Sequence, residues 1–222
     1  MLRGMIFVDH MNFDIALKDY YRTLGRNAPK LDYNELFKNI VALREGINYT
    51  KTYIFVPRPD EFLMKDKSLE SYYKWITGMK SSKYMDIVEG RYIARPTSPD
   101  IEMDIEQRDT YYKVEKGTDL NLAIHALTKA FYNSYDVAFI LSADTDYISL
   151  YKQLKTIGKI VIVVAVKEQH LSQITSEVDD FIFLDDTFFQ LCLRGEKTDS
   201  GYYKKTSYNN GNNINQNKFL NI

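Results

Sequence analysis

The chain is poor in the residues that build a covalently cross-linked fold. It has one cysteine, Cys192, among 222 residues, together with one tryptophan and 5 prolines. A lone cysteine excludes a disulfide framework and is typical of a reducing, cytoplasmic compartment. A chain of this length with 45% hydrophobic residues can instead fold by burying its own apolar surface.

A strong net charge and a long apolar run are also lacking. Lys plus Arg number 29 and Asp plus Glu 30, so the formal charge is −1, and the global basic field of nonspecific DNA-coating proteins is excluded. The longest apolar run, residues 160–166, is far below the roughly 20 residues that span a bilayer. The apolar stretch at the N-terminus stops at Asp9, which is too short for a signal-peptide core. We therefore expect a soluble cytoplasmic protein without a membrane partner.

Short apolar runs rich in β-branched residues alternate with segments of helical spacing. Such runs are typical of strands buried on both faces of a parallel sheet. The expected strands are residues 5–8, 52–56, 86–93, 137–141, 160–166 and 181–184. The expected helices are centred on residues 36–43, 63–79, 123–130 and 150–157. This alternation predicts a doubly wound α/β sheet.

Two segments depart from the alternation. Residues 95–116 are rich in charge and proline, and we interpret them as a loop and a β-hairpin arm over one end of the sheet. The composition changes again after Leu193, where the chain becomes polar and then dominated by Asn. The prediction is a folded domain of residues 1–193 and a flexible tail of residues 194–222.

The aspartates fall where strands end. Asp9 directly follows the first expected strand, and Asp144 and Asp146 follow the strand of residues 137–141. The carboxyl ends of parallel strands meet at one edge of a sheet, where open α/β sheets bind ligands. Asp119 joins this edge if the helix that it opens begins there. The sequence thus predicts a cluster of carboxylates at the carboxyl edge.

Clustered carboxylates repel one another unless they take up protons or a cation. An all-oxygen ligand set selects Mg²⁺ or Mn²⁺ rather than Zn²⁺, and the 3 histidines show no ligand spacing with Cys192. A magnesium-type site that keeps several waters points to phosphoryl chemistry, namely hydrolysis of a phosphodiester.

Each aspartate also has a structural interpretation. Asp144 could be a helix N-cap with Asp146 favourable to the helix dipole, and Asp119 could be an ordinary first-turn residue. For Asp179 and Asp180, which precede the last strand, a loop role is favoured. Asp9 is harder to explain structurally, because it interrupts a buried run. The joint pattern is much less expected by chance than any one member.

Four segments together resemble NYN domains, the relatives of PIN-like nucleases. Residues 6–12 (Ile-Phe-Val-Asp-His-Met-Asn) look like the opening strand with Asp-x-x-Asn, and residues 116–123 contain a Lys-Gly-x-Asp segment. Residues 136–147 end in Leu-Ser-Ala-Asp-Thr-Asp-Tyr, similar to a Ser-Gly-Asp-x-Asp-Phe turn, and residues 178–182 resemble a late Ala-Asp-x-Phe-Ile strand. The segments occur in family order over nearly all of the expected domain.

The resemblance implies a three-layer α/β/α PIN-like fold with a central, mostly parallel sheet and a Mg²⁺- or Mn²⁺-dependent nuclease site directed mostly at RNA. By matching position, Asp9, Asp119 and Asp144 would be metal ligands. Asp146 would be a further ligand or would orient the attacking water, and Asn12 would fix the geometry or contact the scissile phosphate.

The resemblance also gives supporting places to Asp179 and Ser142, behind the ligands, and suggests a homodimer, for which the sequence shows no interface stripe. Two positions depart from the family pattern. Ala143 replaces the usual glycine of the turn, and His125 stands where many relatives carry a second helix aspartate. The second departure puts one contribution to the metal site in doubt.

A nuclease without net positive charge needs local cations to approach phosphates. The candidates for substrate contact are Lys116, Lys113 and Arg95. Tyr111 and Tyr112 could stack on unpaired bases, although packing of the arm onto the sheet is the favoured interpretation for both. The expected partner is RNA, single-stranded or structured, with DNA left open.

Two other functions remain as alternatives. The chain could be a catalytically weak RNA-binding or scaffold module that keeps the fold, and His125 favours this. It could also be a phosphatase built on one strand-end aspartate, but such an enzyme would want a second aspartate where Met11 stands. The sequence favours the endoribonuclease.

Overall fold

The apolar runs form a seven-stranded sheet in the order β4-β3-β2-β1-β5-β6-β7. The computed structural model describes residues 1–197 and 203–204. The strands are β1 (Leu2–Asp9), β2 (Ile47–Pro59), β3 (Met85–Pro96), β4 (Tyr111–Lys116), β5 (Val137–Leu141), β6 (Ile160–Val166) and β7 (Asp180–Leu184). All adjacent pairs are parallel except β3 and β4, which are antiparallel. A separate two-stranded ribbon pairs β8 (Glu196–Lys197) with β9 (Tyr203–Lys204).

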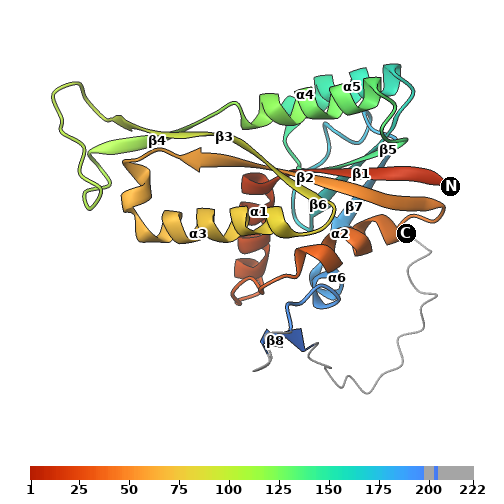
Figure 1. The fold of residues 1–222 in the computed structure, drawn as a ribbon, viewed down its shortest axis with the longest axis horizontal. Coiled ribbons are helices and arrows are strands. Elements are labelled where there is room, and N and C mark those ends of the chain that lie inside the picture. Colours follow the sequence, from red (N-terminus) through yellow and green to blue (C-terminus); the bar gives the residue numbers. More distant parts are fainter. Residues whose placement is uncertain (198–202, 205–222) are drawn as a thin grey trace.

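Helices cover both faces of the sheet, so the predicted three-layer α/β/α architecture is confirmed. The helices are α1 (His10–Thr23), α2 (Tyr33–Ala42), α3 (Lys67–Gly78), α4 (Thr118–Phe131), α5 (Ile148–Thr156) and α6 (Asp186–Gln190), with short 3₁₀ turns η1 (Leu63–Lys65), η2 (Met79–Ser81) and η3 (Thr145–Tyr147). Figure 1 shows α4 and α5 above the sheet and the other helices below it.

Side chains that alternate along each strand contribute to the two hydrophobic clusters, one on each face of the sheet. In β1, Ile6 and Val8 face the cluster that includes α1, α2 and α6, whereas Met5 and Phe7 face the cluster of α4 and α5. Strand residues that alternate in this way point to opposite faces. The buried run of β1 therefore ends with apolar side chains on both sides, and Asp9 follows at its carboxyl end.

The expected strands are all present, and β5 and β6 have the predicted bounds. The helix expected over residues 63–79 is divided, because the Asp66 side chain accepts the amides of Ser68 and Leu69 and begins α3 afresh. Helices α1 and α6 were not predicted, although α1 buries Phe13 and Leu17, one helical turn apart.

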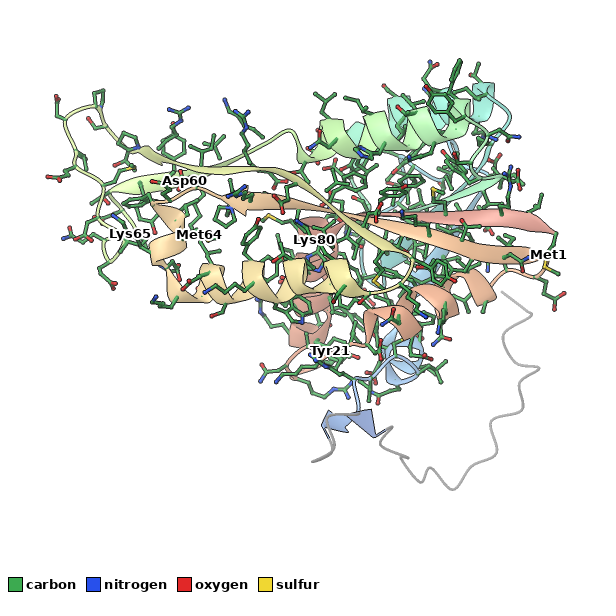
Figure 2. The ribbon with its side chains drawn as sticks, in the orientation of Figure 1. Met1, Tyr21, Asp60, Met64, Lys65 and Lys80 are labelled. Atoms are coloured by element: carbon green, nitrogen blue, oxygen red, sulfur yellow. The ribbon has the colours of Figure 1, made fainter. Side chains whose placement is uncertain are left out.

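The arm expected over residues 95–116 does not lie over the end of the sheet. Instead β3 and β4 form a hairpin within the sheet, with β4 as the edge strand and the end of β2 beside them (Figure 1). Asp60 holds the outer part of this hairpin: the Asp60 carboxylate accepts the amides of Leu63 at 2.9 Å and of Ala94 at 2.9 Å. Figure 2 shows Asp60 where β2 gives way to the turn that carries Met64 and Lys65, ahead of α3. The arm is therefore held to η1 and α3 rather than projecting alone.

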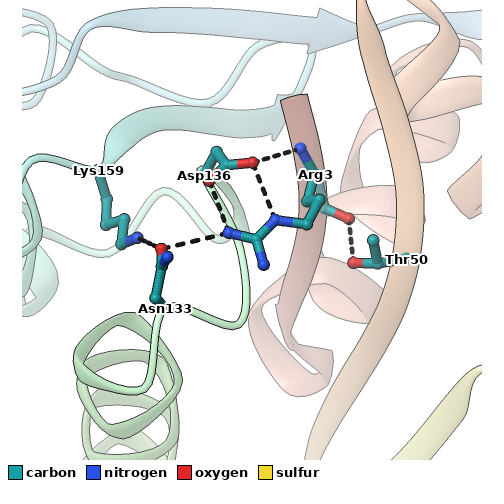
Figure 3. Close-up of polar contacts among 6 residues, drawn as sticks. Arg3, Thr50, Asn133, Asp136 and Lys159 are labelled. Atoms are coloured by element: carbon teal, nitrogen blue, oxygen red, sulfur yellow. Dashed lines mark hydrogen bonds and ion pairs between the residues drawn. The ribbon is translucent and has the colours of Figure 1, made fainter. Parts of the chain in front are cut away.

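The amino edge of the sheet is fastened by a charged pair. The guanidinium of Arg3 donates to both carboxylate oxygens of Asp136, and the Arg3 amide donates to the same group at 2.8 Å (Figure 3). This joins the start of β1 to the residue before β5. The hydrogen bonds from Arg3 hold the pKa of Asp136 well below its usual range.

No helix among residues 1–197 and 203–204 is long and apolar enough to cross a bilayer. The predicted Asn-rich tail lies almost entirely outside the described residues.

Gly90 allows the start of α4 to pack directly against β3. Because Asp119 lies in the first turn of α4, this contact also determines the position of Asp119. A Cβ at Gly90 would lie 2.9 Å from the Thr118 amide nitrogen and 3.1 Å from the Lys116 carbonyl oxygen. We expect Gly90→Ala to lower the free energy of unfolding by about 1–3 kcal/mol, because backbone must move. Urea unfolding measures this. Gly78→Ala is the matched control, since a Cβ there meets nothing within 4 Å; equal stability of the two variants would contradict the prediction.

Candidate active site

The central strands β1 and β5 end side by side, with Val8 paired to Leu141. The next residues along the chain are Asp9 and Ser142, both buried. Polar side chains at this depth have to find partners. The contacts that they make define the candidate site.

Asp9 is 5% exposed and caps α1, with its Oδ1 accepting the Asn12 amide at 3.1 Å. Its Oδ2 lies 3.4 Å from the hydroxyl of Ser142 and 3.3 Å from the hydroxyl of Tyr147. The capping role therefore uses one oxygen, and the other faces the turn after β5.

The hydroxyl of Tyr147 joins two carboxylates that are far apart in the chain. It lies 2.8 Å from Asp119 Oδ1 as well as 3.3 Å from Asp9 Oδ2. Asp119 is exposed in the first turn of α4. The structure therefore brings Asp9 and Asp119 to one hydroxyl group.

Several carboxylates lie close together at this edge and repel one another. The pKa of Asp9 is raised to about 6, mainly by burial and also by the charges of Asp119 and Glu115, against the hydrogen bonds from Asn12 and Tyr147 that lower it. Burial, and then Asp119, also raise the pKa of Glu115. A bound cation would relieve this repulsion.

Asn12 and Ser142 tie the surrounding loops together. The side-chain oxygen of Asn12 accepts the Ala143 amide at 3.3 Å and the Gln169 side-chain amide at 3.1 Å. Ser142 Oγ accepts the Asp144 amide at 3.2 Å. These contacts connect the ends of β1, β5 and β6, so both residues act on the geometry of the edge.

Asp144 and Asp146 occupy the turn after β5. The Asp144 side chain caps η3 by accepting the Asp146 amide at 2.9 Å, so the structural role considered for it is present. Its charge, with that of Asp9, also raises the pKa of the buried Tyr151 hydroxyl, although burial is the larger cause. Asp146 is exposed and shares the wall of a cavity of about 390 Å³ with Asp119 and Tyr147.

The predicted substrate cations lie along the arm at different distances from this edge. Residues that pair across β3 and β4 project from the same face of the hairpin. Lys116 therefore shares a face with Arg91, and Lys113 shares the opposite face with Ala94. At about 3.3 Å per residue, Arg95 lies roughly 23 Å beyond Val88, the residue of β3 level with Asp9. Lys116 is thus the nearest of the three, and Arg95 is near the tip.

Asp179 and His125 lie away from the acidic edge. Asp179 sits at the start of β7, where its carboxylate accepts the Val161 amide at 2.8 Å and pairs with Lys155. That is the amino edge of the sheet, so Asp179 does not lie behind the predicted ligands. His125 packs against the rings of Tyr53 and Phe55, under α4.

Three residues of the site were missed by sequence reasoning. They are Tyr147, which bridges the carboxylates, Glu115, which adds to their repulsion, and Gln169, which holds Asn12. Tyr147 ends the segment already singled out, and Glu115 directly precedes the Lys-Gly-x-Asp segment. Nothing in the local pattern around Gln169 points to the site.

Comparison with known proteins identifies the family of the chain. The family model described as the NYN domain matches residues 3–185. The chain belongs to the NYN domain family. NYN domains are generally PIN-like nucleases, which places the chain at a coarse level among hydrolases of that family.

One solved structure shows the same fold. A protein of unknown function from Vibrio parahaemolyticus is 18% identical, with a TM-score of 0.50, over 84% of this chain and 95% of that one. At this identity the likeness concerns the fold alone. No curated protein matches the chain.

The raised pKa of Asp9 makes this NYN domain less stable at neutral pH than it would be without that charge. Folding raises the pKa from 3.8 to about 6, so the folded state holds the proton more tightly. The cost of the charge is complete above pH 6 and disappears as the pH falls toward 3.8. Without divalent cations, we expect Asp9→Asn to raise the free energy of unfolding at pH 7.5 by about 1–3 kcal/mol.

Urea unfolding of the parent and Asp9→Asn in EDTA, at pH 7.5 and at pH 4, tests this. The two proteins should converge at pH 4. An Asp9→Asn protein that is less stable than the parent at pH 7.5 would show that the carboxylate is favourable where it lies.

Proposed function

We propose that the protein is a divalent-metal-dependent endoribonuclease that hydrolyses RNA at the acidic edge formed by Asp9, Asp119, Asp144 and Asp146. The observation that carries the proposal is the meeting of Asp9 and Asp119 on one hydroxyl, that of Tyr147. Membership of a family of nucleases supports the reaction class. RNA as the substrate rests on the family resemblance.

The donors at this edge fit Mg²⁺ or Mn²⁺. They are carboxylate, hydroxyl and amide oxygens, the ligands of hard cations. Among the described residues, no group of three or more His, Cys, Asp or Glu side chains is arranged as a ready metal site. Mg²⁺ does not need one, because it is commonly held by one or two carboxylates together with waters and substrate phosphates.

Within this proposal Asp9 and Asp119 would hold the cation, which when bound neutralises phosphate charge and makes water a better nucleophile. Asp146 is exposed in the shared cavity wall, where its carboxylate can accept a proton from an incoming water. Asn12 and Ser142 hold the strand ends in register. Asp144 orders the turn that presents Asp146 and Tyr147.

A second candidate is a catalytically weak RNA-binding module with the same fold. Two observations favour it: His125 is packed against aromatic rings at a position where relatives carry an aspartate, and the Asp144 carboxylate serves as a cap. An assay of cleavage separates the two candidates.

We expect the full chain to cleave single-stranded RNA in Mn²⁺ or Mg²⁺ and to be inactive in EDTA. Asp119→Asn should reduce the cleavage rate by about 100-fold or more, because it removes one charge from the cation site. The measurement is the rate of product formation from end-labelled RNA, with single-stranded DNA of the same sequence alongside. Asp144→Asn, assayed in parallel, tests the capping residue.

Asp179→Asn is the matched control. It makes the same chemical change at the opposite edge and keeps an acceptor for the Val161 amide, so its rate should stay within a few-fold of the parent. Equal losses in Asp119→Asn and Asp179→Asn, or cleavage that persists in EDTA, would refute the proposed site. Binding of RNA without cleavage in either metal would favour the second candidate.

A further inference from the structure

A second cavity opens on the other side of the carboxyl edge, beneath the arm. Its volume is about 270 Å³, and its walls come from α1, the end of β2, the start of α3 and the middle of β3. Ligand pockets are usually about 300–1,000 Å³. This one therefore has room for a single small ring system rather than a whole nucleotide.

The walls of this pocket are aromatic and apolar. Tyr72 and Tyr92 contribute rings, and Pro57 and Pro59 contribute rigid apolar surface. The Tyr72 hydroxyl is hydrogen-bonded to Nδ1 of His10, and Nε2 of the same imidazole is 2.8 Å from the Tyr33 hydroxyl. His10 is fully buried, so the ring of Tyr72 is fixed before any ligand arrives.

The ring of Tyr92 packs against the cluster of Leu63, Ala94 and Tyr111. The ammonium of Lys113 lies over this ring, 6.0 Å from its centroid. Lys18 and Asp14 form an ion pair at the wall and supply a donor and an acceptor. The pocket thus combines aromatic rings with a few polar groups.

The pocket lies next to the acidic edge. His10 directly follows Asp9, and Met11 lines the pocket. The charges of Asp14, Glu115 and Asp9 all reach the Tyr72 hydroxyl and raise its pKa, although burial is the main cause. A chain whose backbone crosses the carboxylates can therefore place a neighbouring group in the pocket.

We propose that this pocket binds one unpaired nucleobase of the RNA that crosses the acidic edge, with Tyr92 as the stacking surface. The proposal rests on the proposed function, since it names the substrate as single-stranded where it enters the site. Duplex RNA would keep its bases stacked on one another and could not fill the pocket. Aromatic stacking is tolerant of sequence, so we expect a requirement for a base rather than for one particular base.

The test is fluorescence anisotropy of the full chain with a short single-stranded RNA in EDTA, which suppresses cleavage. Tyr92→Ala should raise the dissociation constant about 5- to 100-fold, the usual effect of losing one stacked base. Tyr92→Phe keeps the ring and should bind within about twofold of the parent. Tyr132→Ala is the matched control, because Tyr132 is an exposed tyrosine at the C-terminal end of α4 and lies outside the pocket.

A scan of the RNA with single abasic positions then locates the base. At one position the abasic RNA should bind the parent more weakly, and this loss should disappear in Tyr92→Ala. Ile15→Trp gives a second route: Ile15 is 52% exposed at the rim, so a larger side chain should block the pocket without disturbing the core. It should reproduce the effect of Tyr92→Ala.

Affinities of Tyr92→Ala and Ile15→Trp equal to that of the parent would overturn the pocket proposal, as would an abasic loss that is unchanged in Tyr92→Ala. The nuclease proposal fails separately. If the abasic loss disappears in Tyr92→Ala but the parent cleaves no RNA in Mn²⁺ or Mg²⁺, the base pocket is supported and the nuclease proposal is refuted. If the parent cleaves RNA but the abasic loss is the same in Tyr92→Ala, the nuclease proposal is supported and the base pocket is refuted.

Discussion

The mutual repulsion of carboxylates at one edge of the sheet is the constraint on which the candidate site depends. Asp9 is buried, Asp119 is exposed, and one hydroxyl lies within hydrogen-bond distance of both. A tyrosine has one proton to donate, so it cannot satisfy two carboxylates at once. Burial is the main cause of the raised pKa of Asp9, and the charges of Asp119 and Glu115 add to it. In the proposed function, a bound cation would relieve this repulsion.

The topology produces this arrangement by two different routes. Asp9 and the turn after β5 are neighbours because β1 and β5 are paired in the centre of the sheet. Asp119 lies just after β4, the last strand of the arm. Its position depends on the contact between the start of α4 and β3. The amide side chain of Asn121 donates to the Glu89 carbonyl at 3.1 Å, and Gly90 admits the backbone of Thr118. The acidic edge is therefore only as well defined as the contact between α4 and the arm.

These two routes explain how much could be predicted from the sequence. Strand-end positions such as Asp9 follow from a local rule, since an apolar run has to stop and parallel strands stop together. The layers and the arm follow from the same alternation of short runs. Tyr147 and Gln169 act through contacts to residues more than a hundred positions away, and no local pattern encodes such pairs. Asp179 shows the converse: its motif resembles the family's, yet it precedes its strand, and the direction of β7 carries it to the opposite edge. Helix α1 was not predicted, although its buried residues Phe13 and Leu17 lie one helical turn apart.

The arm gives the edge two unlike sides. Side chains alternate along β3, so Arg91 and Arg95 share one face with Lys116, while Tyr92 and Ala94 share the other with Glu115 and Lys113. The second face packs on η1 and α3, where Leu63 is fully buried, and it ends in the aromatic pocket. Glu115, whose charge raises the pKa of Asp9, also lies on the second face, so the second face and its aromatic pocket adjoin the acidic edge. The first face carries the side chains of Arg91, Arg95 and Lys116. In the proposed complex the RNA therefore has to pass along the second face to place a base in the pocket. Only an unpaired base can enter there, because a duplex keeps each base stacked and paired inside the double helix.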